Sequence, residues 1–483
     1  MTLLVDGLLD ALRDRPGAPA LLGRRPTTRG ELADLADGYA AALHHRGLGE
    51  GDTLALAVRP GGRALALVLA ALRLRVRVAV VDPGAGPDVV TARLALARPA
   101  LVVADPVVQA AAGWAAPVAR RLGLSLPRLE LLAPVATVGR RLPGTAPALE
   151  PRSGPAPDRR GDDADAVVVF TSGTTAAPRA VVHTVASMSA GMAAVADLVG
   201  PRPGEPVLGG TFFVLVPALH AGAPVLAPAR RPPALARQLA RLAPAATYLT
   251  PPQLRGALAA GAGFTGRVFA GSAPVSEGLL GRVRDAGADQ AWGVYALTEA
   301  FPVAAVEWTA KHAHTGDGDL VGELLPGVRA RVDGTGQLLV AGATTADRYL
   351  GGEPLEEVAT GDRARLEGRT VVLAGRAKDM LLRGAENVYP GLYEPALHVP
   401  GVDLAVLVGV PGEDGDERVV AVVQPTPGST EVQVRRALAT PLSRMGTARP
   451  DAVLVGPVPV AGRSRKPDRA ATARWAAERL ARR

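Results

Sequence analysis

The stretch "VVVFTSGTTAAPRAVVH", residues 167–183, contains the strongest indication of what this chain does. An apolar run ends at Phe170, a run of hydroxyl-bearing residues around Gly173 follows, and Arg179 comes shortly after. Hydroxyls and backbone N–H groups can donate to phosphate oxygens, and a nearby cation can neutralise them. The Walker pattern G-x-x-x-x-G-K-[ST] is absent. The stretch therefore predicts a phosphate-holding loop after a strand, with an ordinary polar turn as the alternative.

The segments before this loop alternate between the hydrophobic patterns of helices and those of strands. Residues 27–47 open with a capping box formed by Thr28 and Glu31, and their apolar spacing predicts a helix. Residues 53–58 predict a strand, 63–75 a helix, 76–84 a strand running into a turn, and 166–170 a further strand. Strands separated by helices favour an α/β fold with a mostly parallel sheet covered on both faces.

Two composition changes divide the chain. Residues 140–165 are rich in proline and predict a linker or long loop. Beyond residue 376, short strands at 403–410, 417–425 and 452–458 and helices at 430–439 and from 468 onward predict a small α+β domain. We therefore expect a large domain at residues 1–376 and a small mobile domain at residues 377–483.

Composition excludes several classes of protein. The chain has 483 residues, 48% of them hydrophobic, and no apolar run approaches the ~20 residues that span a bilayer. It has no cysteine, so a disulfide, a thiol nucleophile and a thiolate metal site are all excluded. The net charge is +8, but the arginines are mixed with acidic residues, which argues against a nucleic-acid partner. The start lacks the basic and small-residue regions of a signal peptide, so the expected location is cytoplasmic.

The segment "FTSGTTAAPRAV" resembles the signature loop of the adenylate-forming superfamily, which includes acyl-CoA synthetases, luciferases and peptide-synthetase adenylation domains. That loop usually has the pattern aromatic-T-S-G-[ST]-[ST]-G-x-P-K-G-V, and this chain differs at Ala176, Arg179 and Ala180. The resemblance implies ATP as the nucleotide. It also implies that the β- and γ-phosphates are held by Thr171, Ser172, Gly173, Thr174, Thr175 and Arg179.

Two further segments resemble motifs of the same superfamily in chain order. "AGSAP" is similar to its adenine-facing segment, which implies that Gly271, Ser272 and Ala273 lie beside the base. "VYALTEA" is similar to Y-G-x-T-E, with Ala296 in place of the glycine. The resemblance implies that Tyr295 lies beside the adenine, Thr298 near the α-phosphate, and Glu299 on Mg²⁺.

The last motifs bring in two of the chain's three lysines, Lys311, Lys378 and Lys466. "TGDRAR" and "GRAKDMLLRGAENVYP" resemble the ribose-binding and hinge motifs, which implies that Asp362 and Arg376 contact the ribose and that Lys378 is the hinge. "GRSRKPDR" resembles the final motif, in which Lys466 bridges the incoming carboxylate and the α-phosphate. Lys311 has no role that the motifs suggest.

The superfamily's reaction joins a carboxylic acid to ATP as acyl-AMP with release of pyrophosphate, usually followed by transfer to a thiol. Apolar surroundings favour a fatty or other hydrophobic acid, and the candidate pocket residues are Phe212, Phe213 and His220. We expect an acyl-CoA synthetase with CoA as co-substrate.

A first alternative is lactone formation without CoA, because "AVVDPGAG", "TVGRRLPG" and "LTEAFPVA" resemble β-lactone synthetases of olefin biosynthesis. A second is a non-catalytic binder, which alanines at positions 176, 180, 296 and 385 would permit.

Overall fold

The computed structural model describes residues 6–23, 25–82, 86–121, 126–157, 163–170, 179–383, 386–412, 417–462 and 465–482. These residues form two compact units. Unit 1 comprises residues 1–228, 298–301 and 343–356, and unit 2 comprises residues 229–297, 302–342 and 357–483. The predicted domain boundary at residues 376 and 377 lies inside unit 2 and stays a prediction.

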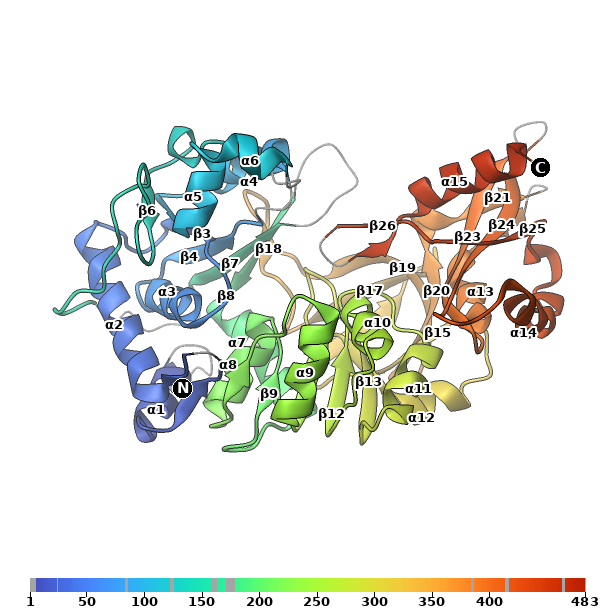
Figure 1. Cartoon of the computed structure of the whole chain (residues 1–483), viewed down its shortest axis with the longest axis horizontal. Coiled ribbons are helices and arrows are strands. Elements are labelled where there is room, and N and C mark those ends of the chain that lie inside the picture. The colour runs from blue at the N-terminus through green and yellow to red at the C-terminus, as the bar shows by residue number, and fades with distance from the viewer. Residues whose placement is uncertain are drawn as a thin grey trace. The chain divides into compact units, whose positions relative to one another are not determined.

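Unit 1 is built on a seven-stranded sheet in the order β18-β8-β7-β4-β3-β5-β6. The five strands from β7 to β6 pair in parallel, while β8 and β18 are antiparallel. Figure 1 shows α4, α5 and α6 on one side of this sheet and α3 on the other. The mostly parallel, covered sheet expected from the sequence is therefore confirmed. The strands are β3 (Thr53–Ala57), β4 (Arg77–Val80), β5 (Leu101–Ala104), β6 (Val135–Thr137), β7 (Asp165–Phe170), β8 (Ala180–Thr184) and β18 (Arg348–Tyr349).

The remaining elements of unit 1 include the predicted N-terminal helix. Thr28 and Glu31 form the expected capping box at the start of α2. The short strands of this unit are β1 (Pro19–Leu21), β2 (Thr27–Thr28), β9 (Val207–Leu208) and β10 (Val225–Leu226). The helices are α1 (Asp6–Asp14), α2 (Arg29–His45), α3 (Gly62–Arg73), α4 (Pro87–Ala97), α5 (Pro106–Ala112), α6 (Ala116–Arg121), α7 (Val185–Val199) and α8 (Phe212–His220).

Within the predicted linker, the described residues 140–157 contain no helix, and Ala148 makes an isolated bridge to Thr137. A long loop is the expected consequence of its prolines, which remove N–H donors and restrict the backbone. None of the described helices is long and apolar enough to cross a membrane.

Unit 2 contains a large mixed sheet in the order β16-β17-β19-β20-β15-β14-β13-β12-β11. The strands β11, β12 and β13 are parallel, and the others pair antiparallel. The strands are β11 (Ala246–Leu249), β12 (Arg267–Ala270), β13 (Gln290–Tyr295), β14 (Ala304–Glu307), β15 (Asp319–Leu324), β16 (Val328–Val332), β17 (Gln337–Gly342), β19 (Val358–Glu367) and β20 (Thr370–Arg376). The helices are α9 (Pro232–Leu242), α10 (Pro251–Ala259), α11 (Glu277–Asp285) and α12 (Trp308–Ala313).

The C-terminal part of unit 2 has the predicted α+β composition. Alternate residues of its central strands enter two separate apolar clusters, one of which includes α14 residues and the other α15 residues. Figure 1 shows these two helices on opposite sides of the small sheet. The main elements are β23 (Val402–Pro411), β24 (Glu417–Pro425), β25 (Ala452–Val455), α13 (Pro390–Tyr393), α14 (Glu431–Ser443) and α15 (Arg469–Ala481). The two-stranded pairs are β21 (Leu381–Arg383) with β22 (Glu386–Val388), and β26 (Val460–Ala461) with β27 (Lys466–Pro467).

Two buried ionic contacts stabilise unit 2. The carboxylate of Asp403 at the start of β23 forms ion pairs with Arg255 of α10, at 3.1 Å, and Arg282 of α11, at 3.0 Å. Lys311 is 7% exposed, and its ammonium donates to the Asp319 carboxylate and the carbonyl of Leu320. The lysine to which sequence motifs assigned no role therefore holds α12 against β15.

Candidate active site

The predicted adenine-facing segment follows β12 directly. Gly271 has little room for a side chain, since a Cβ there would lie 2.8 Å from the Tyr248 hydroxyl and 3.1 Å from the carbonyl oxygen of Val294. Ser272 has a positive φ of 69°, and its hydroxyl lies 3.2 Å from that of Tyr248. Because β12 and β13 are parallel neighbours, Gly271 at the end of β12 and Tyr295 at the end of β13 lie at the same edge of the sheet. Ala273 follows at this edge.

A hydrogen-bonded set joins three of the predicted site residues. Asp362 on β19 pairs directly with Arg376 at the end of β20. The Tyr295 hydroxyl donates to one carboxylate oxygen of Asp362 at 2.7 Å, and the Arg376 Nε donates to the other at 2.8 Å. Asp362 is 4% exposed. Burial, followed by the Asp362 charge, raises the pKa of Tyr295 well above its usual range, so its hydroxyl stays protonated.

Lys466 lies within electrostatic range of this set. The residue as a whole is exposed on β27, but the protein around its ammonium group, followed by the Arg376 charge, lowers its pKa. Asp362 opposes that shift and Lys378 adds to it. Lys378 is exposed in a short 3₁₀ turn directly after β20. Three cations, Arg376, Lys378 and Lys466, thus lie within electrostatic range of one another, an arrangement that suits an anionic ligand.

The metal-binding candidate Glu299 in unit 1 accepts hydrogen bonds at both its side-chain carboxylate and its backbone carbonyl. The Tyr349 hydroxyl on β18 donates to Glu299 Oε1 at 3.1 Å, and the Ala346 N–H donates to the Glu299 carbonyl at 2.8 Å. Arg179 precedes β8, and its guanidinium carbon lies 5.6 Å from the centre of the Tyr349 ring. Burial, then the Glu299 charge, raises the pKa of Tyr349. The structure therefore brings Arg179 and Glu299 to the same tyrosine.

His183, which the sequence motifs did not single out, supports the adjoining residue. Its side chain is buried, and its Nε2 lies 2.8 Å from the carbonyl oxygen of Thr298. Burial lowers its pKa, which favours the neutral imidazole. Since a carbonyl only accepts, the N–H of the neutral ring belongs on Nε2, and Nδ1 faces the Ser187 hydroxyl at 3.2 Å. The signal in the sequence is a histidine that directly follows the apolar residues 180–182 of β8.

The three candidate pocket residues lie on one helix, α8, but at its two ends. Phe213 near the start packs on Phe301, with ring centres 3.8 Å apart, and Phe301 is two residues beyond Glu299. Phe212, its neighbour, is partly buried. His220 ends the helix, where burial, followed by the nearby Arg29 charge, lowers its pKa. Phe213 is thus connected to the Thr298–Glu299 segment, whereas His220 lies beside Arg29.

The phosphate loop itself, including Thr171, Ser172, Gly173, Thr174 and Thr175, lies outside the described residues. The strand before it, β7, ends at Phe170 as predicted, and Arg179 is the first described residue after it.

The residues near Glu299 are compatible with Mg²⁺. The described residues contain no group of three or more His, Cys, Asp or Glu side chains suited to a metal ion. Mg²⁺ is usually bound through one or two carboxylates together with substrate phosphates and water. One carboxylate with one oxygen held by Tyr349 matches that requirement. Glu299 would hold the ion, which would neutralise charge on the phosphates.

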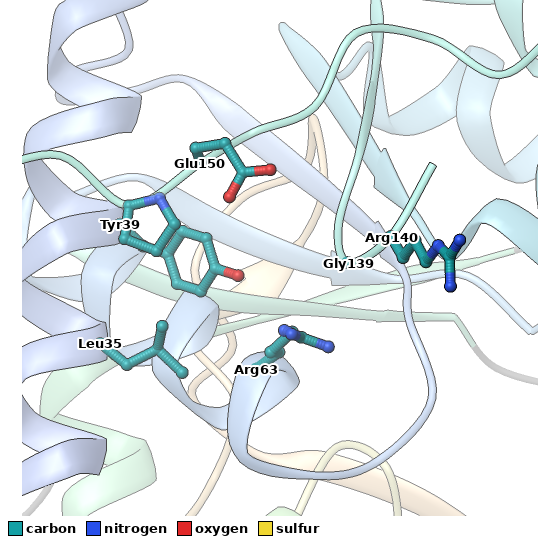
Figure 2. A pocket seen from close by; sticks show the side chains of 7 residues that line it. Leu35, Tyr39, Arg63, Gly139, Arg140 and Glu150 are labelled. Atoms are coloured by element: carbon teal, nitrogen blue, oxygen red, sulfur yellow. The ribbon is translucent and has the colours of Figure 1, made fainter. Parts of the chain in front are cut away.

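A separate cavity of about 340 Å³ lies in unit 1. Figure 2 shows the Tyr39 hydroxyl, the Arg63 guanidinium and the Glu150 carboxylate among the groups that line it, with Leu35 below the Tyr39 ring. Burial raises the pKa of Tyr39, and the Arg63 charge opposes that shift. None of these residues belongs to the motifs that predict the ATP site.

Comparison with known proteins agrees with the motifs. The sequence model of the AMP-binding enzyme family matches residues 8–350. The chain belongs to this family. It is an adenylate-forming enzyme of the ligase type, and its structural neighbours have the adenylate-forming fold.

Three relatives illustrate the range within this AMP-binding family. The chain is 26% identical to an olefin β-lactone synthetase of Xanthomonas campestris pv. campestris, over 87% of this chain and 84% of the relative. It is 35% identical to the fatty acid–[acyl-carrier-protein] ligase ScoC of Streptomyces coeruleorubidus, over 33% of this chain and 34% of the relative. The amide bond synthetase McbA from Marinactinospora thermotolerans has a TM-score of 0.79 at 24% identity, covering 97% of this chain and 99% of that one.

Proposed function

We propose that this AMP-binding enzyme activates a carboxylic acid with ATP and Mg²⁺, forming acyl-AMP and releasing pyrophosphate. The observation that carries the proposal is the set formed by Tyr295, Asp362 and Arg376, with Lys466 in its electrostatic field. A buried carboxylate with two fixed donors can accept bonds from ribose hydroxyls on its remaining lone pairs. The cations beside it favour a phosphate and a carboxylate in the same place.

The residues then take distinct roles. Lys466 neutralises the incoming carboxylate and the α-phosphate as they approach, which lets two anions meet. Thr298 lies near the α-phosphate, and the residues from Thr171 to Thr175 with Arg179 hold the outer phosphates. Gly271, Ser272 and Ala273 lie beside the adenine with Tyr295. Phe212, Phe213 and His220 contribute to the acid pocket, and the acid is fatty or otherwise hydrophobic.

For the second step we propose transfer of the acyl group to CoA after the small domain, residues 377–483, turns about Lys378. A second candidate is lactone closure by the substrate's own β-hydroxyl. The similarity to an olefin β-lactone synthetase over 87% of this chain favours it. The two steps differ in what releases AMP: a thiol in the first case, and an intramolecular hydroxyl in the second.

The test is a panel of acids that includes straight-chain and β-hydroxy acids, scored for ATP–pyrophosphate exchange and for AMP release with and without CoA. Exchange with at least one hydrophobic acid is expected. AMP release that needs CoA supports the ligase, and CoA-independent release from β-hydroxy acids alone supports lactone closure. Absence of exchange with every acid would leave only a non-catalytic nucleotide binder.

Two lysine substitutions test the assigned roles. Lys466→Ala is expected to abolish exchange with an unchanged fold, whereas Lys378→Ala is expected to slow mainly the second step. Arg474→Ala, on the exposed side of α15, is the matched control and should leave exchange unchanged. Near wild-type acyl-AMP formation by Lys466→Ala would refute the assignment.

A further inference from the structure

Resting on the proposed function, we propose that His183 is a positioning residue for the metal site. It holds the carbonyl of Thr298, and through that peptide it fixes where the Glu299 carboxylate points. His183 touches neither nucleotide nor acid in this role. Its effect is on how tightly the divalent cation of the metal–ATP complex is bound.

The first support is the contact itself. His183 is 3% exposed, and its Nε2 lies 2.8 Å from the Thr298 carbonyl oxygen. The residue after that carbonyl is Glu299. A peptide plane is rigid, so fixing the oxygen of residue 298 restricts the direction in which the backbone enters residue 299.

The second support is that two of the restraints on Glu299 come from neighbouring strands, β8 and β18. His183 lies on β8, and the same strand pairs with β18 so that Val181 faces Tyr349. Tyr349 donates to Glu299 Oε1. The carboxylate is thus held through its side chain by Tyr349 and through the preceding peptide by His183. Arg179 immediately precedes this strand, so β8 links the phosphate-side cation to the metal-side carboxylate.

The third support is that the Thr298 carbonyl has no second hydrogen-bond donor among the described residues. Among the hydrogen bonds between described residues, the contact to His183 is the one recorded for this oxygen. A substitution that removes the Nε2 donor would leave the carbonyl without it and free the peptide to rotate. Loss of a residue that orients a metal ligand typically costs ~10–100-fold in metal affinity or activity.

The experiment compares His183→Leu, His183→Asn and His183→Gln. Leucine has no donor. The amide nitrogen of glutamine reaches the position of Nε2, whereas that of asparagine reaches only the position of Nδ1. The first readout is equilibrium binding of Mn²⁺ with ATP, followed by electron paramagnetic resonance, which requires no turnover. The second is the Mg²⁺ concentration giving half-maximal pyrophosphate exchange, measured beside the KM for the acid.

We expect Leu and Asn to weaken Mn²⁺–ATP binding ~10–100-fold and to raise the Mg²⁺ requirement equally, with the acid KM unchanged, while Gln stays within about threefold of wild type. His312→Leu, at an exposed histidine of α12, is the matched control and should change neither. The proposal would be overturned if the Leu, Asn and Gln variants bound Mn²⁺–ATP equally well. It would also be overturned if all three lost both metal binding and acid binding, with no recovery in the Gln variant. If wild type binds Mn²⁺–ATP but exchanges no pyrophosphate with any acid, the proposed function fails while the binding comparison still decides the role of His183.

Discussion

Replacing Asp362 by alanine is the sharpest test of the buried set in unit 2. The change removes the acceptor of the Tyr295 hydroxyl and the partner of Arg376 together. The side chain of Asp362 is 6% exposed, and that of Arg376 is 42% exposed. The two losses therefore differ in size, because one donor is stranded in the interior and the other regains water.

The magnitude follows from these exposures. A buried hydroxyl left without an acceptor costs about 1–3 kcal/mol. An ion pair with a guanidinium this exposed contributes at most about 1 kcal/mol. The free energy of unfolding should therefore fall by about 1–4 kcal/mol in Asp362→Ala. Asp362→Asn keeps an oxygen acceptor for Tyr295, so it should lose only about 1 kcal/mol.

Urea unfolding of wild type, both variants and the control Asp289→Ala would measure these values. Asp289 is exposed and its carboxylate has no recorded partner among the described residues, so the control should stay within about 0.5 kcal/mol of wild type. If Asp362 binds the ribose as proposed, ATP binding should weaken in both Asp362 variants, since each removes the negative charge of this side chain. An Asp362→Ala variant as stable as the control, or more stable than Asp362→Asn, would refute the reasoning.

Three further substitutions test other contacts. Asp403→Ala strands two largely buried arginines and should lower the free energy of unfolding by about 3 kcal/mol in urea, and a loss below about 1 kcal/mol would contradict a buried pair. Gly191→Ala would gain about 1 kcal/mol of helix propensity. Its Cβ, however, would lie 2.5 Å from the Phe301 carbonyl oxygen, so we expect a net loss of about 1–2 kcal/mol and a lower melting temperature; a stabilised variant would show that the segment yields freely. Because the pKa of Tyr295 is raised, the unfolded chain loses that proton first as pH rises above about 10, so stability falls there. In Tyr295→Phe the free energy of unfolding should fall less between pH 9 and pH 11 than it does in wild type. Urea unfolding at each pH measures this, and an equal fall in both proteins would contradict the raised pKa.

Motifs with fixed spacing and strong periodicities were the parts of this protein that the sequence could predict. The capping box at Thr28 and Glu31, the strand that ends at Phe170 and the strand over residues 417–425 all appear in the structure. Each depends on neighbours within a few residues, where local hydrogen bonding and side-chain alternation decide the conformation. The family, too, could be recognised from short motifs in order.

Other features needed contacts between distant segments. Lys311 had no interpretation until β15 placed Asp319 beside it. The contact between His183 and Thr298 joins residues 115 positions apart, and no periodicity signals it. The pairing of β18 with β8 places the Tyr349 hydroxyl within hydrogen-bond distance of Glu299. It depends on a strand of two residues, which is too short to give a sequence pattern.

The sequence by itself determined the family, the order of the motifs and the chemical character of each candidate residue, because these depend on residue type and local spacing. The tertiary structure decided which donor faces which acceptor. Asp362 became a buried carboxylate held by two partners because β19 and β20 pair in one register. Glu299 became a carboxylate with fixed neighbours because β8 carries His183 and pairs with β18, which carries Tyr349. Such pairings arise from strand register, which is set by the packing of whole sheets.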